Sequence, residues 1–137
     1  MESEKKLKNL LKKLEAHPQD PAILLELGNK YIELGEHASA IQMLKQILSD
    51  DPNHGTALNN IAYSHEELGR EEKAKKYYIK AIRSNFNSAA VPWSNLASLY
   101  IKREHSQKFE FCMRMALSID PTLFGGPQPN HDYNYYS

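Results

Sequence analysis

The chain has 137 residues, which is enough for one domain and too short for two well-formed ones. Hydrophobic residues make up 41% and charged residues 25%, so we expect a packed core rather than a disordered chain. The 17 basic and 17 acidic side chains balance to a formal charge of zero. This balance removes the long-range attraction to phosphate, so we expect no nucleic-acid partner.

The expected location follows from what the sequence lacks. No apolar run approaches the roughly 20 residues needed to cross a bilayer, so no membrane insertion is expected. The N-terminal segment is interrupted by charge every second or third residue and lacks a signal-peptide core. Cys112 is the single cysteine, so no internal disulfide can form, which suits a reducing compartment. We therefore expect a cytoplasmic protein.

Residues 3–16 form the first predicted element, a helix whose polar face is rich in lysine. Aligning Pro18 with Pro52 places Leu10 over Leu44, a leucine in the second helix of the repeat that follows. The match predicts that this segment is the second helix of a degenerate repeat. It is expected to cap one end of a helical array while its lysines meet water.

From residue 21 onward the sequence resembles itself with a step of thirty-four residues. The units begin at Pro21, Gly55 and Ala90, the last of them after one extra residue, Ala89. Corresponding positions then hold similar side chains. The fourth position holds Leu24, Leu58 and Trp93, and the seventh holds Leu27, Ile61 and Leu96. The eighth holds Gly28, Ala62 and Ala97, and the eleventh holds Tyr31, His65 and Tyr100. The twentieth holds Ala40, Ala74 and Phe109.

Each unit is predicted to contain two short antiparallel helices, because its apolar residues recur at spacings of three and four. Gly35 and Gly69 end the first helix of the first two units, since glycine adopts the left-handed conformation readily. Glu104 replaces this glycine in the third unit, so we expect a less sharply defined turn there. Pro52 and Pro121 end the second helices, because proline disfavours a helical residue before it.

This pattern resembles the tetratricopeptide repeat family, whose signature runs W-x2-L-G-x2-Y…A-x3-F…A…P. The resemblance implies an all-α fold, a right-handed superhelical array of antiparallel helix pairs. Small residues at the eighth position let the helices of a pair approach closely, and stacking buries the apolar stripes that one pair leaves open. Pentatricopeptide arrays have a similar helix pair but bind RNA, which the neutral charge disfavours. The expected organisation is a capping helix at 1–20, three units at 21–54, 55–89 and 90–123, and a flexible tail at 124–137.

Candidate catalytic and metal-binding residues are few. His65-Glu66-Glu67-Leu68 begins like a zinc-protease helix motif, but Gly69 stands where the second histidine is needed. We interpret His65 as a replacement for the usual tyrosine of the repeat, inside a helix pair. The other histidines show no metal-ligand spacing, no glycine-rich phosphate loop occurs, and Cys112 is expected to be a packed thiol. We therefore expect no enzymatic activity, no metal site and no cofactor.

In the family that the chain resembles, the first helices of successive units line a concave groove that binds a peptide. The resemblance assigns to this groove Asn29, Glu33, Asn59, Asn60, Tyr63, Glu67, Ser94, Asn95, Ser98 and Lys102. Asparagine suits peptide capture because one side chain can donate to a carbonyl and accept from an amide. Asn60 and Asn95 share a position in adjacent units, so changing both to alanine is expected to weaken peptide binding.

The charge of this groove limits its ligands. The family's carboxylate clamp for C-terminal EEVD tails needs basic residues where Leu25, Val91 and Asn95 stand, so a chaperone-tail clamp is rejected. Four glutamates are predicted to make the first half of the groove acidic and to favour a basic or neutral ligand. They are Glu26, Glu33, Glu66 and Glu67.

The last predicted helix, about Ser106 to Ile119, is apolar on more than one side and should therefore be covered. A second copy of the chain, the aromatic tail and a partner protein are the three candidate coverings. Self-association is favoured slightly over the tail, which predicts a homodimer or partner surface at Phe111, Met115 and Ile119.

The sequence thus predicts a protein-interaction module, or adaptor, that holds a peptide or a helix of a partner protein in its groove. Two alternatives stay open. One is a small chaperone for a secreted or assembly-prone client, similar to the three-repeat chaperones of bacterial type III secretion. The other is a component of an oligomeric assembly whose main contact is the last helix.

Overall fold

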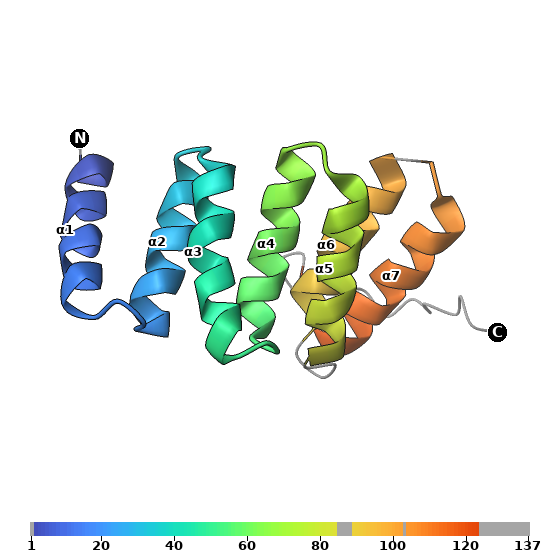
Figure 1. Cartoon of the computed structure of the whole chain (residues 1–137). Coiled ribbons are helices and arrows are strands. Elements are labelled where there is room, and N and C mark those ends of the chain that lie inside the picture. The colour runs from blue at the N-terminus through green and yellow to red at the C-terminus, as the bar shows by residue number, and fades with distance from the viewer. Residues whose placement is uncertain (1, 85–88, 103, 124–137) are drawn as a thin grey trace. The chain divides into compact units, whose positions relative to one another are not determined.

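The computed structural model describes residues 2–84, 89–102 and 104–123, and within them the regular secondary structure consists of α-helices joined by short turns. It groups into two compact units, residues 1–84 and 85–137. Figure 1 shows α1 to α5 in chain order within the first unit, and α6 paired with α7 within the second. The helices are α1 (Glu2–Ala16), α2 (Pro21–Glu33), α3 (His37–Asp50), α4 (Gly55–Glu67), α5 (Glu71–Ser84), α6 (Ala90–Lys102) and α7 (Ser106–Ile119). The all-helical expectation is confirmed.

Local side-chain contacts fix where α2 and α4 begin. The carboxylate of Asp20 accepts a hydrogen bond from the N–H of Ala22 at 2.9 Å, and Pro21 follows with a φ suited to the first helical turn. At the start of α4, Nδ1 of His54 accepts a hydrogen bond from the N–H of Ala57 at 3.1 Å. Both helices therefore start where the thirty-four-residue step predicts.

The turns inside the three helix pairs share one backbone conformation. Gly35 and Gly69 have φ of 76° and 78°, and the two backbone hydrogen bonds that close each turn measure between 2.8 and 3.0 Å. Glu104 adopts φ of 58°, and its turn closes through the same two bonds, 3.1 Å from its own N–H and 3.0 Å from that of His105. The hydrogen bonds thus keep at Glu104 a conformation that its side chain disfavours. The expectation of a less sharply defined turn stays a prediction, because Arg103 lies outside the described residues.

The second helices end at proline as predicted. The last residues of α3 and α7 are Asp50 and Ile119, each two positions before a proline. The aspartate that separates each helix end from the proline accepts a hydrogen bond from the backbone N–H two residues later. Oδ1 of Asp51 accepts the N–H of Asn53 at 3.2 Å, and Oδ1 of Asp120 accepts the N–H of Thr122 at 3.0 Å.

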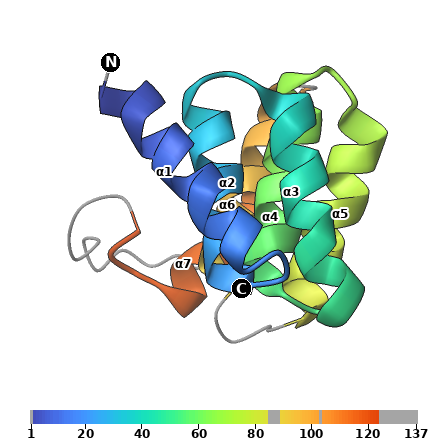
Figure 2. The same cartoon turned by 60° about the vertical axis from the view of Figure 1, so that its left-hand side comes forward.

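Close helix packing in the first unit depends on Gly28. A Cβ at this position would lie 2.6 Å from Cδ2 of Leu44 on α3, a separation that real Cβ atoms essentially never show. Leu44 is fully buried and packs in one cluster with Leu24 of α2 and Ile61 of α4. Figure 2 shows the resulting arrangement, with α3 and α5 on one side of the unit and α2 and α4 on the other. The small eighth position therefore brings the two helices of this pair into direct contact.

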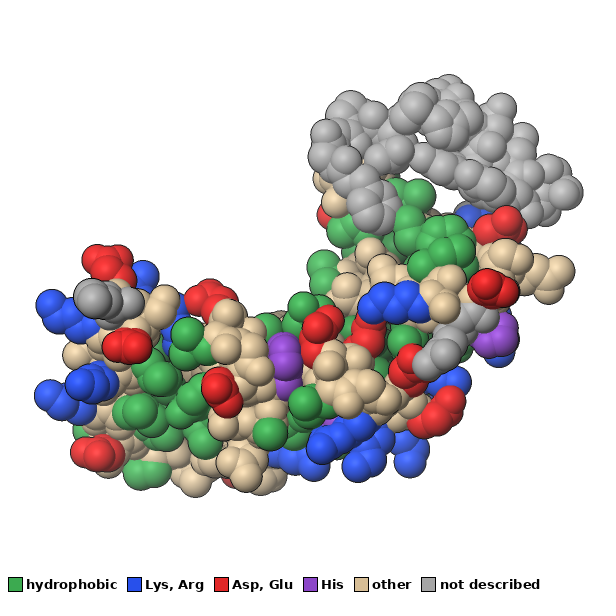
Figure 3. Space-filling model, turned by 90° about the horizontal axis from the view of Figure 1, so that it is seen from above, with side chains coloured by type: hydrophobic (Ala, Val, Ile, Leu, Met, Phe, Trp, Pro, Cys, Tyr) green, Lys and Arg blue, Asp and Glu red, His purple; other side chains and the backbone are tan. Residues whose placement is uncertain are grey.

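Helix α1 covers the outer side of α2. Leu10, its one buried residue, packs against Ile23 and Leu27. Figure 3 shows Lys, Asp and Glu side chains on the outer surface at the left-hand end, where α1 lies. The expected role of α1 as a cap and the boundary at residue 20 both stay predictions. The expected flexible tail at 124–137 lies outside the described residues.

Candidate functional site

Polar residues of α2 and α4 that are exposed or half-buried form one surface, which we call the α2–α4 face. It comprises Asn29 and Glu33 of α2 and Asn60, Tyr63 and Glu67 of α4. Nδ2 of Asn60 donates to Oδ1 of Asn29 at 2.8 Å, and Oδ1 of Asn60 accepts from Nδ2 of Asn59 at 3.4 Å. Three of the predicted groove asparagines are therefore joined into one chain of amides across two neighbouring helices.

The three amides differ in what they can offer a ligand. Asn59 is only 9% exposed, so it acts on the face through Asn60 and contributes almost no surface of its own. Asn29 is exposed and accepts at Oδ1, and this hydrogen bond does not use the Nδ2 donor of Asn29. Because amides in a chain hold each other in one orientation, Asn29 and Asn60 present donors and acceptors in a fixed arrangement.

A hollow of about 440 Å³ lies between α1 and α2, at one end of this face. Glu26, Glu33, Lys30 and two lysines of α1, Lys6 and Lys13, are among its lining residues. The sequence predicts an acidic surface here, and the structure instead shows mixed charge. The two α1 lysines are missing from the sequence-based groove because it took residues from the first helix of each unit only.

Glu33 is held by its neighbour rather than left open to a ligand. Nζ of Lys30 lies 2.8 Å from Oε2 of Glu33, and this hydrogen bond, together with the charge of Lys30, lowers the pKa of the Glu33 carboxyl. Both groups reach solvent, so the ion pair adds little to stability. Its consequence is local, because it neutralises one of the charges on which the acidic interpretation relied.

Aromatic and acidic residues on α4 have defined contacts. Tyr63 is 38% exposed and meets the ring of His37 edge-on at 6.1 Å between centroids. Glu66, which the sequence also assigns to the groove, accepts a hydrogen bond at Oε1 from the hydroxyl of Tyr78 at 2.9 Å. Tyr78 is fully buried, and burial together with Glu66 raises its pKa. Glu66 is therefore anchored to α5, while Tyr63 presents an aromatic surface.

The predicted groove residues of the third repeat lie on α6, in the second unit. Ser98 and Lys102 are exposed, whereas Ser94 and Asn95 are half-buried. The hydroxyl of Ser98 donates to the backbone carbonyl of Ser94 at 3.2 Å, so this serine is already occupied as a donor. These four residues form a polar row along α6.

The two candidates for chemistry, His65 and Cys112, are both buried. His65 is 3% exposed and stacks on Tyr77 at 5.5 Å; burial first, then the charges of Arg70, Lys73 and Lys45, lower its pKa. Cys112 is 2% exposed, and burial raises the pKa of its thiol to about 11. Both interpretations as packed side chains are confirmed.

The described residues also lack two features that other classes of site require. Within them, no group of three or more His, Cys, Asp or Glu side chains is arranged to hold a metal ion. No helix in the same part of the chain has both the length and the apolar composition to cross a membrane.

Comparison with known proteins identifies the class of protein that this arrangement represents. A family model for the tetratricopeptide repeat matches residues 8–54 and 32–99, which together span most of α1 to α6. The chain belongs to the tetratricopeptide repeat family, a family of helical-repeat modules for protein–protein interaction. The resemblance drawn from the repeated sequence is thereby confirmed.

Two curated relatives contain a similar segment within a longer chain. Anaphase-promoting complex subunit 3 of Schizosaccharomyces pombe is 27% identical over 108 residues, which cover 79% of this chain and 16% of the relative. The uncharacterized protein ycf37 of Pyropia yezoensis is 37% identical over 62 residues, 45% of this chain and 35% of the relative. The chain thus matches about a sixth and about a third of these two relatives.

Solved structures of MamA share the fold. One MamA crystal structure superposes with a TM-score of 0.75 at 23% identity, covering 85% of this chain and 68% of MamA. MamA from Desulfovibrio magneticus RS-1 gives a TM-score of 0.78 at 10% identity, covering 90% and 70%. At such identities the similarity establishes the helical-repeat fold, which confirms the predicted fold class.

Proposed function

We propose that this protein is a non-catalytic adaptor that binds a peptide or a helix of a partner protein on its α2–α4 face. The observation that carries the proposal is the amide chain from Asn59 through Asn60 to Asn29. A pair of amides held in one orientation, with Asn29 exposed and Asn60 half-buried, can donate to a peptide carbonyl and accept from a peptide N–H. Tyr63 adds an aromatic surface beside them, and aromatic residues are enriched at the centres of protein interfaces.

The charge of the face limits the partner. Lys6, Lys13 and Lys30 at the α1 end face two glutamates, Glu26 and Glu33, and Glu67 is exposed at the end of α4, so the face carries three charges of each sign. We therefore expect a ligand of mixed or low net charge, read mainly through its backbone. Because each amide contact contributes modestly, about 0.5–1.5 kcal/mol, the ligand needs several contacts along the face.

The test is a double substitution, Asn29→Ala with Asn60→Ala. Affinity capture with the wild-type chain identifies a partner, and isothermal titration with a peptide from that partner measures the affinity. We expect the double variant to bind about tenfold or more weakly, because two donor–acceptor pairs are removed.

A matched control is Gln42→Ala with Gln107→Ala, which removes two exposed amides from α3 and α7. This control is expected to keep the wild-type affinity. Equal affinity of the wild type and the Asn29/Asn60 variant, with both folded by circular dichroism, would show that the α2–α4 face is not the binding site.

A second proposal concerns assembly through α7. Phe111 is 48% exposed, packs edge-on against Trp93 at 5.7 Å, and shares its stripe of the helix with Met115 and Ile119, which are half-buried. An apolar stripe of this kind suits a protein contact, and we propose a second copy of the chain as its occupant. The chaperone alternative stays a prediction, which co-purification with a single aggregation-prone client would support.

A further inference from the structure

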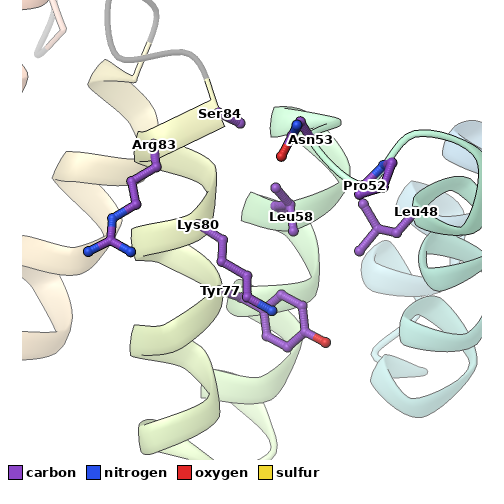
Figure 4. Close-up of a pocket in the computed structure, with 8 residues that line it drawn as sticks. All are labelled: Leu48, Pro52, Asn53, Leu58, Tyr77, Lys80, Arg83 and Ser84. Atoms are coloured by element: carbon purple, nitrogen blue, oxygen red, sulfur yellow. The ribbon is translucent and has the colours of Figure 1, made fainter.

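The side of the first unit that carries α3 and α5 contains a cleft of about 530 Å³. Figure 4 shows its walls: Leu48, Pro52 and Asn53 from the end of α3 and the following turn face residues of α5, with Leu58 of α4 between them. The α5 wall consists of Tyr77, Lys80, Arg83 and Ser84. We call this the α3–α5 cleft, and all of its lining residues belong to the first unit.

The lining has cations and no carboxylate. Lys80 and Arg83 are both exposed, and neither forms an ion pair within the described part of the chain. The nearest acidic residue along the chain, Asp51, accepts the backbone N–H of Asn53 and is not part of the lining. Exposed cations without an acidic neighbour attract an anion that the chain itself does not supply.

The floor of the cleft is apolar and firmly held. Leu58 is 2% exposed, and the half-buried ring of Tyr77 is fixed from below by its stacking on His65. Nζ of Lys80 lies 5.0 Å from the centre of the Tyr77 ring, and Figure 4 shows the lysine side chain extending across it. The ammonium group is therefore positioned over a rigid surface rather than dispersed in solvent.

The positive charge continues beyond the cleft. Lys45 on α3 and Lys73 on α5, together with Arg70 before α5, all act on His65, which lies directly beneath Tyr77. These three cations are exposed, and they come from α3, from α5 and from the turn before α5. A point anion would use only one of them, whereas an extended chain with several carboxylates could contact them in succession.

We propose that the α3–α5 cleft binds an acidic peptide segment of a partner protein, with one carboxylate at Lys80 and an apolar side chain on Tyr77 and Leu58. A second carboxylate contacts Arg83 at the edge of the cleft, where its side chain extends to the other side of α5 (Figure 4). The charge of the lining argues for acidic residues, and the apolar floor argues for a peptide that alternates acidic and apolar side chains. This surface is separate from the α2–α4 face, so the two proposals can fail independently.

The probe is a short fluorescein-labelled peptide that alternates glutamate and leucine, and its partner probe carries glutamine in place of glutamate. Fluorescence anisotropy should show saturable binding of the acidic probe that weakens as salt is added, and no binding of the glutamine probe. Lys80→Glu with Arg83→Glu should weaken the acidic probe roughly tenfold or more. Absence of binding to the wild-type chain at low salt would overturn the proposal.

Lys8→Glu with Lys12→Glu is the matched control, because it changes the net charge equally on exposed positions of α1 that line neither hollow. This control and Asn29→Ala with Asn60→Ala should both retain the affinity for the acidic probe. An equal loss in the α1 variant would mean nonspecific attraction, and a loss in the asparagine variant would place the peptide on the α2–α4 face. Tighter, Lys80-dependent binding of oligothymidylate would make a nucleic acid the occupant; each of these results contradicts the proposal.

Discussion

At the scale of single residues, His65 shows how much a repeated position reveals. Tyr31, His65 and Tyr100 share one position, and this match predicted that the histidine lies inside a helix pair. The structure places it there, 3% exposed and stacked on Tyr77. The sequence does not show the surrounding cations, Lys45 among them, because they come from neighbouring helices whose rotation about their own axes the period does not determine.

Replacement of His65 by tyrosine should reduce the pH dependence of stability. The pKa of His65 is lowered by folding, so below about pH 6.5 the unfolded chain binds a proton that the folded chain does not. The stabilising contribution of the neutral ring is therefore present above that pH and is lost as the pH falls. We expect the melting temperature of the wild type to fall more than that of the His65→Tyr variant between about pH 7.5 and pH 5.5.

His17→Gln provides the control for this experiment, because His17 is exposed in the turn after α1. Removal of His17 should leave the difference in melting temperature between the two pH values the same as in the wild type. Parallel melting curves for wild type and His65→Tyr across the whole interval would show that His65 does not govern this dependence.

The asparagines mark the limit of residue-level prediction. Periodicity pairs Asn60 with Asn95, since both stand at the same place in adjacent units. The structure pairs Asn60 with Asn29 instead, at 2.8 Å across α2 and α4. Side-chain contacts join different positions of successive repeats, and these depend on rotamers and helix spacing that a sequence pattern does not contain.

At the scale of elements, the helix boundaries were predictable because their signals are local. Asp20 and Pro21 begin α2, Gly35 and Gly69 terminate helices in the left-handed region, and the residue before Pro52 lies outside α3. The third turn is the exception. It has glutamate at the glycine position and yet the same two hydrogen bonds, because the packing of α6 against α7 requires the same reversal of the chain.

Glu104→Gly should stabilise the α6–α7 pair. A side chain with φ of 58° lies in the region that costs an L-residue roughly 1–2 kcal/mol, and glycine removes this cost while adding disorder to the unfolded chain. We expect a net gain of about 0.5–1 kcal/mol in the free energy of unfolding, measured by urea titration.

Gly69→Ala gives the reciprocal comparison, since φ of 78° at this position disfavours any side chain. It should destabilise by a similar amount in the α4–α5 turn. If Glu104→Gly instead lowers the midpoint of unfolding, the glutamate side chain makes a stabilising contact that outweighs the backbone strain.

At the scale of the whole molecule, the period of thirty-four residues predicted the three helix pairs and the fold class. It did not predict that the described chain divides into two compact units at residues 84 and 85. The boundary between the two compact units falls after α5, the second helix of the second repeat. The number of repeats does not indicate this boundary, because all three repeats share the same sequence pattern.

Phe111→Glu tests the proposed contact between two copies of the chain. The ring is 48% exposed on α7, so a buried charge at a dimer interface would be strongly unfavourable, while the same charge in a monomer meets water. Light scattering should give a dimer mass for the wild type and a monomer mass for the variant. Leu11→Glu, at a residue of α1 that is 37% exposed, should keep the wild-type mass. An unaltered mass after Phe111→Glu would contradict self-association through α7.

The contacts within the first unit have a consequence for how the chain acquires its structure in time. The helices that pack most extensively are neighbours along the chain: α2 with α3, α3 with α4, and α4 with α5. Contacts between near neighbours close short loops, and chains dominated by them fold in microseconds to milliseconds. On a ribosome, each pair could dock as it emerges, at about 5–20 residues per second, long before synthesis ends. The apolar faces of the first unit are then buried before the following repeats are synthesised, so those repeats cannot form non-native contacts with them.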